Sequence, residues 1–193
     1  MVGRVLLASI VAAVLMFVWG FVFWGLCSMV TKLAAPLPAE LDVLAALRNS
    51  QAPSGMYIYP MPADPSDKEA QAECEKKFLE GPLLQLAYRK EGVLMMAPSM
   101  FAQGLGLNFA VALLTSCLLA LAAGGLPHFG GRLVFVLLVS LVAAIWTNVG
   151  DVVWWFHSPF YCLGNMAYVM GAGLVMGLVV ATIVRRPAEQ TDA

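Results

Sequence analysis

The residues best suited to chemistry lie near the end of one long apolar segment. Asn148, Asp151 and His157 occur there within a short stretch. An Asp–His pair can relay a proton or hold a metal ion, and an ionisable group inside a membrane-spanning helix is a functional hypothesis by default. Asp151, however, lies within about a turn of the expected membrane surface, where a carboxylate reaches water at little cost. We therefore favour an interfacial carboxylate that pairs with Lys32, Arg89 or a backbone group.

A second candidate is a set of soft metal ligands in the polar part of the chain. Thioether and thiolate groups suit Cu(I), and the candidates here are Met56, Met61, Met95, Met96 and Met100, together with Cys74. Their spacing contains no M-x-M or M-x-x-M array, and methionine also fills irregular apolar gaps. Copper or redox handling therefore remains an alternative hypothesis, and we expect no bound cofactor.

Small residues recur at helical spacing in two apolar segments, and they would let helix backbones approach closely. The stronger series is Gly171, Gly173, Gly177 and Ala181, and the weaker one is Ala112, Ser116 and Ala120. We favour packing within the chain's own bundle. The alternative is that these seams mediate self-association or docking to a protein partner.

The composition shows what must position these residues. Of 193 residues, 61% are hydrophobic and 12% are charged, whereas a soluble domain has about 25% charged residues. Of the 23 acidic and basic residues, 16 lie between Lys32 and Glu91. This pattern excludes an ordinary water-soluble globule, a basic nucleic-acid-binding domain and a disordered chain. We expect a lipid bilayer to be the main partner.

Four apolar runs are long enough to cross a bilayer as helices, which takes about 20 residues. They are predicted at residues 1–31, 101–124, 132–155 and 160–185, with a short tail at 186–193. The first run is longer than the apolar part of a signal peptide, about 7–15 residues, so we expect a retained anchor. The sequence therefore predicts an all-α membrane protein, a four-helix transmembrane bundle.

Basic residues in short loops predict the orientation, because they favour the cytoplasmic side. The basic residues that flank the spans on one side are Arg4, Arg132, Arg185 and Arg186. We expect both termini in the cytoplasm and residues 32–100 outside the inner (cytoplasmic) membrane. Trp24, Trp154 and Trp155 would then lie at the outer interface. Trp19 and Trp146 lie deeper, so we expect them to pack between helices.

The segment 32–100 is predicted as a small α+β insert between the first two spans. Its expected order is a helix at 39–48, a strand at 56–59, a helix that starts with a capping box at Ser66, a strand at 83–89 and a returning strand at 93–96. Its core is thin, so we expect it to lean on the outer ends of the spans or on a partner. One pair among Cys27, Cys74 and Cys162 could form a disulfide, but the sequence fixes no pairing.

The sequence contains no catalytic motif such as G-x-S-x-G, H-E-x-x-H or a P-loop, and we expect no enzyme. The preferred hypothesis is an accessory or structural protein that docks into a larger membrane complex. Besides copper handling, the remaining alternative is a small oligomeric transporter or channel lined by Asn108, Asn148 and Asp151. The spans lack the internal prolines and charged lining that substrate paths usually need. Asn108 could instead bond Asn148 across the bundle.

Overall fold

The computed structural model describes residues 1–185, so the predicted tail at 186–193, with Arg186, lies outside the described residues. The chain divides into two compact units. We call the first unit, residues 1–35 and the chain from 96 onward, the bundle. The second unit, residues 36–95, is the insert. Each unit is described by itself.

Four helices in the bundle are long and apolar enough to cross a membrane, which confirms the predicted fold class. The first span consists of α1 (Val2–Gly20) and the π-helical segment η1 (Phe21–Leu26), and the second is α5 (Pro98–Ala122). The third joins α6 (Phe129–Ala144), the π-helical segment η2 (Ile145–Val149) and α7 (Gly150–Trp155). The fourth is α8 (Pro159–Ile183).

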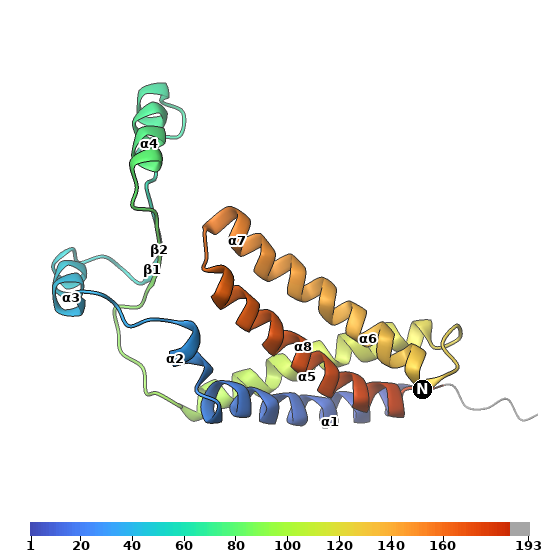
Figure 1. Ribbon diagram of the computed structural model, residues 1–193. Coiled ribbons are helices and arrows are strands. Elements are labelled where there is room, and N and C mark those ends of the chain that lie inside the picture. Colours follow the sequence, from blue (N-terminus) through green and yellow to red (C-terminus); the bar gives the residue numbers. More distant parts are fainter. Residues whose placement is uncertain (186–193) are drawn as a thin grey trace, which may run out of the picture. The chain divides into compact units, whose positions relative to one another are not determined.

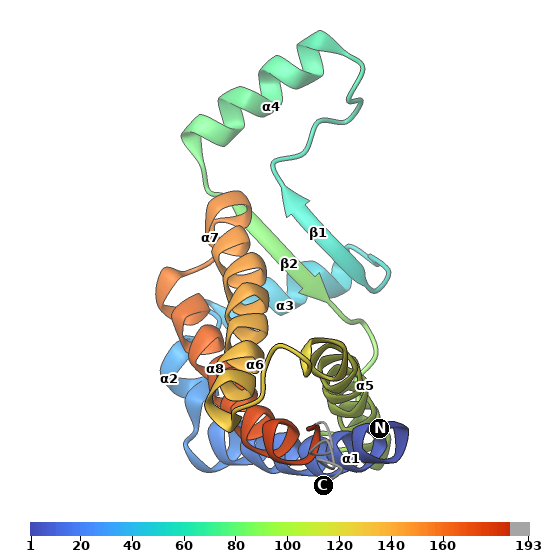
Figure 2. The same ribbon diagram turned by 90° about the vertical axis from the view of Figure 1, so that its right-hand side faces the viewer.

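The four spans pack in the order α5, α1, α8, α6, and each packs closely against its neighbours in that order. α1 lies between α5 and α8, α8 packs against α6, and α5 and α6 touch only weakly (Figure 2). Small side chains dominate the core between α1 and its neighbours, including Ala8, Ala12 and Ala112. Large apolar side chains such as Leu121 and Val142 are exposed, as expected of helices whose outer surfaces contact lipid.

The spans define two ends of the bundle (Figure 1). At one end α1 begins, the α5–α6 loop turns and α8 finishes, and we call this the arginine end after Arg4, Arg132 and Arg185. The α7–α8 turn lies at the opposite end, because each helix reverses direction relative to the one before it. Side-chain bonds hold the arginine end together: Arg4 Nη1 donates to the Arg185 carbonyl and Arg132 Nε donates to the Ala181 carbonyl.

The first span ends earlier than predicted. The helix stops after Leu26 because Ser28 adopts a left-handed backbone conformation with φ 51°. A short helix, α2 (Met29–Leu33), follows this break. The sequence pattern extended the span to residue 31 because the residues on both sides of the break are apolar.

The insert contains α3 (Glu40–Asn49), β1 (Gly55–Tyr59), α4 (Lys68–Glu80) and β2 (Leu84–Tyr88). The two strands form an antiparallel ribbon, with Gly55 opposite Tyr88 and Tyr59 opposite Leu84, and α4 lies in the connection between them. Figure 1 shows α4 beyond the end of this ribbon.

Two local predictions for the insert were wrong. Residues 93–96 do not form a returning strand, because β2 pairs with β1 instead. Ser66 does not cap α4. The Asp67 carboxylate accepts the Glu69 backbone N–H at the start of the helix, while the Ser66 hydroxyl donates to Asp64. Glu73 and Lys77, four residues apart on α4, form an ion pair with 2.6 Å between Glu73 Oε1 and Lys77 Nζ.

Candidate functional site

Asp151 and His157 form a polar pair at the α7–α8 turn. His157 Nδ1 lies 3.8 Å from Asp151 Oδ2, and the His157 backbone N–H donates to the Asp151 carbonyl at 3.2 Å. Phe156 adopts a left-handed conformation between them, with φ 56°. Both polar side chains are more than a third exposed. The structure therefore brings together the two ionisable residues singled out by the sequence, at a turn that solvent can reach.

Asn148 lies one turn before this pair, in η2, and is buried. Its Nδ2 donates to the Ala144 carbonyl and to Thr147 Oγ1, both at 3.0 Å. Asn108 is half-buried in α5, and no hydrogen bond joins it to Asn148 within residues 1–185. The predicted bond across the bundle is therefore wrong. Asn148 satisfies its amide within its own helix.

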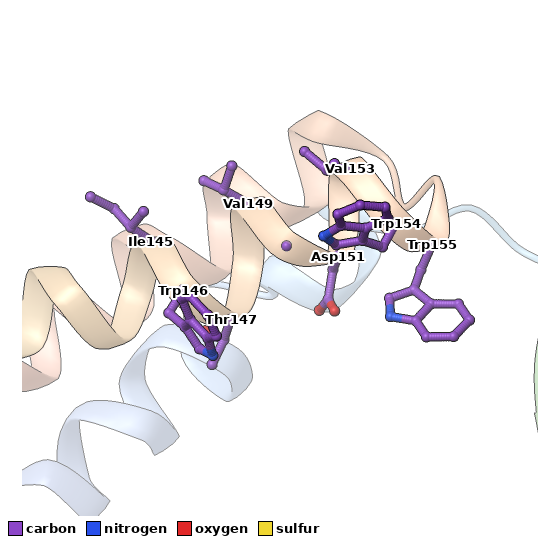
Figure 3. A pocket seen from close by; sticks show the side chains of 9 residues that line it. Ile145, Trp146, Thr147, Val149, Asp151, Val153, Trp154 and Trp155 are labelled. Carbon is purple, nitrogen blue, oxygen red and sulfur yellow. The ribbon is translucent and has the colours of Figure 1, made fainter.

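A groove runs beside this polar group, and all its lining residues belong to the continuous segment 145–155. Ile145, Val149 and Val153 point to one side of this segment, and Asp151 points to the other (Figure 3). Three tryptophans supply most of the remaining lining: Trp146, Trp154 and Trp155. One carboxylate among indole rings offers an amphipathic surface typical of a membrane interface rather than a set of reacting groups.

The two deep tryptophans behave differently. Trp146 is 83% exposed, so the prediction that it packs between helices was wrong. Trp19 does pack between helices: its Nε1 donates to the Tyr168 carbonyl at 3.0 Å. Its ring also lies 5.6 Å from that of Phe23, which contacts Tyr168 in turn. These aromatic rings join η1 and the end of α1 to the first half of α8.

The glycine series on α8 lies inside the bundle. A Cβ atom at Gly171 would come within 2.3 Å of the Trp19 ring. At Gly173 it would come within 2.3 Å of Ser140 Oγ, and at Gly177 within 2.8 Å of Leu133 Cδ1. Ala181, Ala112 and Ser116 are fully buried, and Ala120 packs against the core. The chain's own helices therefore occupy these faces, and a partner helix would have to bind elsewhere.

Arg132 makes the main polar contact at the arginine end, although only 7% of its surface is exposed. Nε donates to the Ala181 carbonyl at 2.8 Å, and Nη1 donates to the carbonyls of Leu126 and Pro127. The guanidinium thus joins the last turn of α8 to the α5–α6 loop. In the sequence, Arg132 indicated only orientation. The only sequence feature that could have indicated this bridging role is the position of a single arginine at the start of an apolar run.

The candidate metal ligands in and beside the insert are largely open to solvent. Met56, Met61, Met95 and Met96 are all exposed, and Cys74 is half-buried. Within the described residues, no group of three His, Cys, Asp or Glu side chains could hold a metal ion. All four cysteines are unpaired. The copper hypothesis thus still rests on residue type and gains no support from geometry.

The insert has almost no interior. Among residues 36–95 only Pro60 is buried. Large apolar side chains on three different segments are open, at 83% for Leu41, 82% for Leu79 and 85% for Met95. Hydrogen bonds at one end of the ribbon, where Ser54 Oγ donates to Glu91 and accepts from the Lys90 backbone N–H, supply order but little burial.

No family model matches the chain, and neither a curated protein nor a solved structure is similar to it at a significant level. Function must therefore be inferred from the residues and their surroundings. The structure shows a multi-pass membrane protein with four spans. The insert is the part of the molecule whose apolar side chains are least buried within the protein itself.

Proposed function

We propose that this protein is a non-catalytic accessory subunit of a larger membrane protein complex, and that the insert contacts the partner protein. The observation that carries this proposal is the lack of an apolar core in residues 36–95, where Pro60 alone is buried. An isolated two-stranded ribbon is marginally stable at best in water. The exposed apolar side chains would gain about 25 cal/mol for each Å² covered by a partner.

Other ways to stabilise so small a unit lack support. Small domains usually depend on disulfides, metal ions or oligomerisation when their cores are insufficient. Cys74 is unpaired, and the described residues of the insert offer no cluster of metal ligands. The glycine faces of the bundle are filled by Trp19 and α6. A protein surface against the insert is the source of burial that these observations favour.

We further infer that the arginine end faces the cytoplasm of a cell bounded by an inner membrane. Arg4, Arg132 and Arg185 lie at that end, and short basic segments favour the cytoplasmic side. The insert would then be extracytoplasmic. A chain whose only cysteine is Cys74 should react with a membrane-impermeant maleimide in intact cells. If Cys74 reacted only after the cells were opened, the insert would lie in the cytoplasm and the proposed orientation would be wrong.

The docking proposal is tested by photo-crosslinking and native gels. A photoreactive residue at Leu79 should give one discrete adduct in native membranes, and the same residue at Ala63, in the turn between β1 and α4, serves as the control. Leu41→Glu and Leu79→Glu should abolish the heavier species on a native gel after mild detergent extraction. Glu75→Gln, an exposed change on α4, should leave that species intact.

The possible occupants give different results. Crosslinks from Leu79 to a different protein, lost in Leu41→Glu, support an accessory subunit. Co-purification of two differently tagged copies, with no second protein, would replace that subunit with a homo-oligomer. Crosslinks only to the chain's own helices would mean that the bundle covers the insert, and the proposal would be wrong.

A further inference from the structure

The arginine end of the bundle carries positive charge without an opposing acid among the residues that the structure describes. Arg4, Arg132 and Arg185 lie there, and the only acidic residue among residues 1–35 and 96–185 is Asp151, at the opposite end. Arg132 is 7% exposed. A guanidinium that is largely removed from water attracts anions more strongly than one in bulk solvent, because the effective dielectric constant around it is lower.

The arginines converge on the end of α8 and the residues just after it. Arg132 Nε binds the Ala181 carbonyl, and Arg4 Nη1 binds the Arg185 carbonyl. The Ala181 carbonyl lies in the last turn of α8, and the Arg185 carbonyl lies two residues beyond the end of the helix at Ile183. Two guanidinium groups from different helices are thus held at one helix end, each by a bond that fixes part of its orientation.

Arg132 retains donors that its own chain does not use. Its Nε–H and the two N–H groups of Nη1 are occupied by three carbonyls. No acceptor for Nη2 occurs among residues 1–185. The only fully buried side-chain polar atom without a partner in that range is Ser116 Oγ. Nη2 therefore reaches the surface of the protein, where it can donate to a ligand.

We propose that the arginine end binds the phosphate group of an anionic phospholipid, with Arg132 Nη2 as its central donor and Arg4 and Arg185 as flanking charges. Guanidinium groups bind phosphate oxygens through paired, charge-assisted hydrogen bonds. A lipid phosphate fits better than a free one because Arg132 lies in the first turn of a span that begins at Phe129. Basic sites between helices at this depth are where anionic headgroups bind.

The experiment compares lipids on the purified full-length protein in a neutral detergent. Phosphatidylglycerol should raise the unfolding temperature more than phosphatidylcholine does at the same concentration, and native mass spectrometry should show a retained phosphatidylglycerol molecule. Arg4→Gln and Arg132→Gln should each weaken phosphatidylglycerol binding by roughly tenfold. Arg89→Gln, in the insert, is the matched control and should bind as the natural protein does.

Three results would overturn the proposal. The first is equal stabilisation by the two lipids. The second is full stabilisation by inorganic phosphate alone, which would point to a free anion. The third is unchanged phosphatidylglycerol binding by Arg4→Gln and Arg132→Gln. If Arg132→Gln does not fold because its three carbonyl bonds are lost, Arg4→Gln and Arg185→Gln decide the outcome, since both positions are exposed.

Discussion

Gly173 shows how closely two spans approach at a single residue. A Cβ there would lie 2.3 Å from Ser140 Oγ and 2.5 Å from Ser140 Cβ. The Ser140 hydroxyl meanwhile donates to the Val136 carbonyl of its own helix at 3.0 Å. Because Cβ is fixed to the backbone, Ser140 cannot make room by rotating its side chain. α6 itself would have to move.

Gly173→Ala should therefore destabilise the bundle by about 1–3 kcal/mol, the usual cost of overpacking a close-packed interior. The matched control is Gly106→Ala in α5, where an added Cβ meets nothing within 4 Å. That change should alter stability by no more than about 1 kcal/mol, the difference in helix propensity between the two residues. Unfolding of the purified proteins in mixed micelles measures both, and equal stabilities would refute this account of Gly173.

Sequence spacing could identify the glycine face but not which tryptophans pack. Both Trp19 and Trp146 lie deep in apolar runs, yet only Trp19 contacts another span. Trp146 belongs to the π-helical η2. A π-helix follows an i→i+5 hydrogen-bond pattern, which changes the face on which later residues lie. Apolar periodicity at 3.6 residues per turn does not predict that change.

At the scale of elements, the break between η1 and α2 limits the first span. Ser28 holds φ 51° and ψ 40° there. This region costs L-residues roughly 1–2 kcal/mol, whereas glycine enters it freely. Apolar residues on both sides hide the break in the sequence. Hydropathy alone therefore predicted a longer span than the structure contains.

Ser28→Gly should stabilise the protein by about 1 kcal/mol, because glycine adopts the left-handed conformation without the steric cost that serine carries. Ser28→Val should destabilise it by a similar amount, because a β-branched side chain tolerates positive φ poorly. The two variants change the same exposed position in opposite directions, so each is the control for the other. Thermal unfolding in detergent measures both. A destabilising Ser28→Gly would contradict the assigned backbone conformation.

The end of the β1–β2 ribbon where Ser54 contacts Lys90 and Glu91 should lose order at low pH. The pKa of Glu91 lies below the ordinary glutamate value, because its carboxylate accepts its own backbone N–H and the Ser54 hydroxyl. A folded-state pKa that is lowered contributes stability above the ordinary pKa, and that contribution is lost as the pH falls through the lowered value. The Lys90 amide, which donates to Ser54 Oγ, should therefore lose its protection from hydrogen exchange in acid.

Glu91→Gln should remove this acid response. Exchange rates corrected for the intrinsic effect of pH separate loss of structure from chemistry. Glu75→Gln, on α4, should keep the response of the natural protein. If the Lys90 amide stayed equally protected on both sides of the transition, the Ser54–Glu91 contact would not contribute to the order of this ribbon end.

The sequence pattern gave the wrong partner strand and the wrong helix cap in the insert, and each error has a physical reason. The predicted strands at 83–89 and 93–96 are close in sequence, but β2 pairs instead with β1, which lies much earlier in the chain. Likewise Asp67 competes with Ser66 for the start of α4, and the Asp67 carboxylate accepts the Glu69 N–H group. Single-sequence patterns do not show which of two adjacent caps or two possible strand partners is preferred.

At the scale of the whole molecule, the division into bundle and insert predicts that the two parts differ in autonomy. The bundle contains nearly all the buried residues, whereas the insert contains one, Pro60. Replacing residues 36–95 with a flexible Gly/Ser linker should therefore leave membrane insertion and the unfolding temperature of the bundle unchanged. The insert produced alone should be unfolded, with poorly dispersed amide resonances.

Folding of the insert alone would contradict the assignment of its stability to a partner surface. Collapse of the linker variant would show instead that the bundle depends on the insert. A linker variant that still forms the heavier species on a native gel would locate the docking surface on the bundle.

The four spans could be predicted because each is a continuous run of apolar residues long enough to cross a bilayer. In lipid, such a run must form a helix to satisfy its backbone hydrogen bonds. The role of Arg132 could not be predicted, because its three carbonyl acceptors come from a loop and from α8, far along the chain. Nor does the sequence reveal the occupant of the insert's surface.

The nearly coreless insert also affects the lifetime of the protein. Segments with few buried contacts open easily, and proteases cut the open form. A copy that has not bound the proposed partner should be cleaved within residues 36–95 while its spans remain in the bilayer. The amount of this protein in a cell would then follow the supply of the proposed partner, so surplus copies would be cleared without a dedicated regulator.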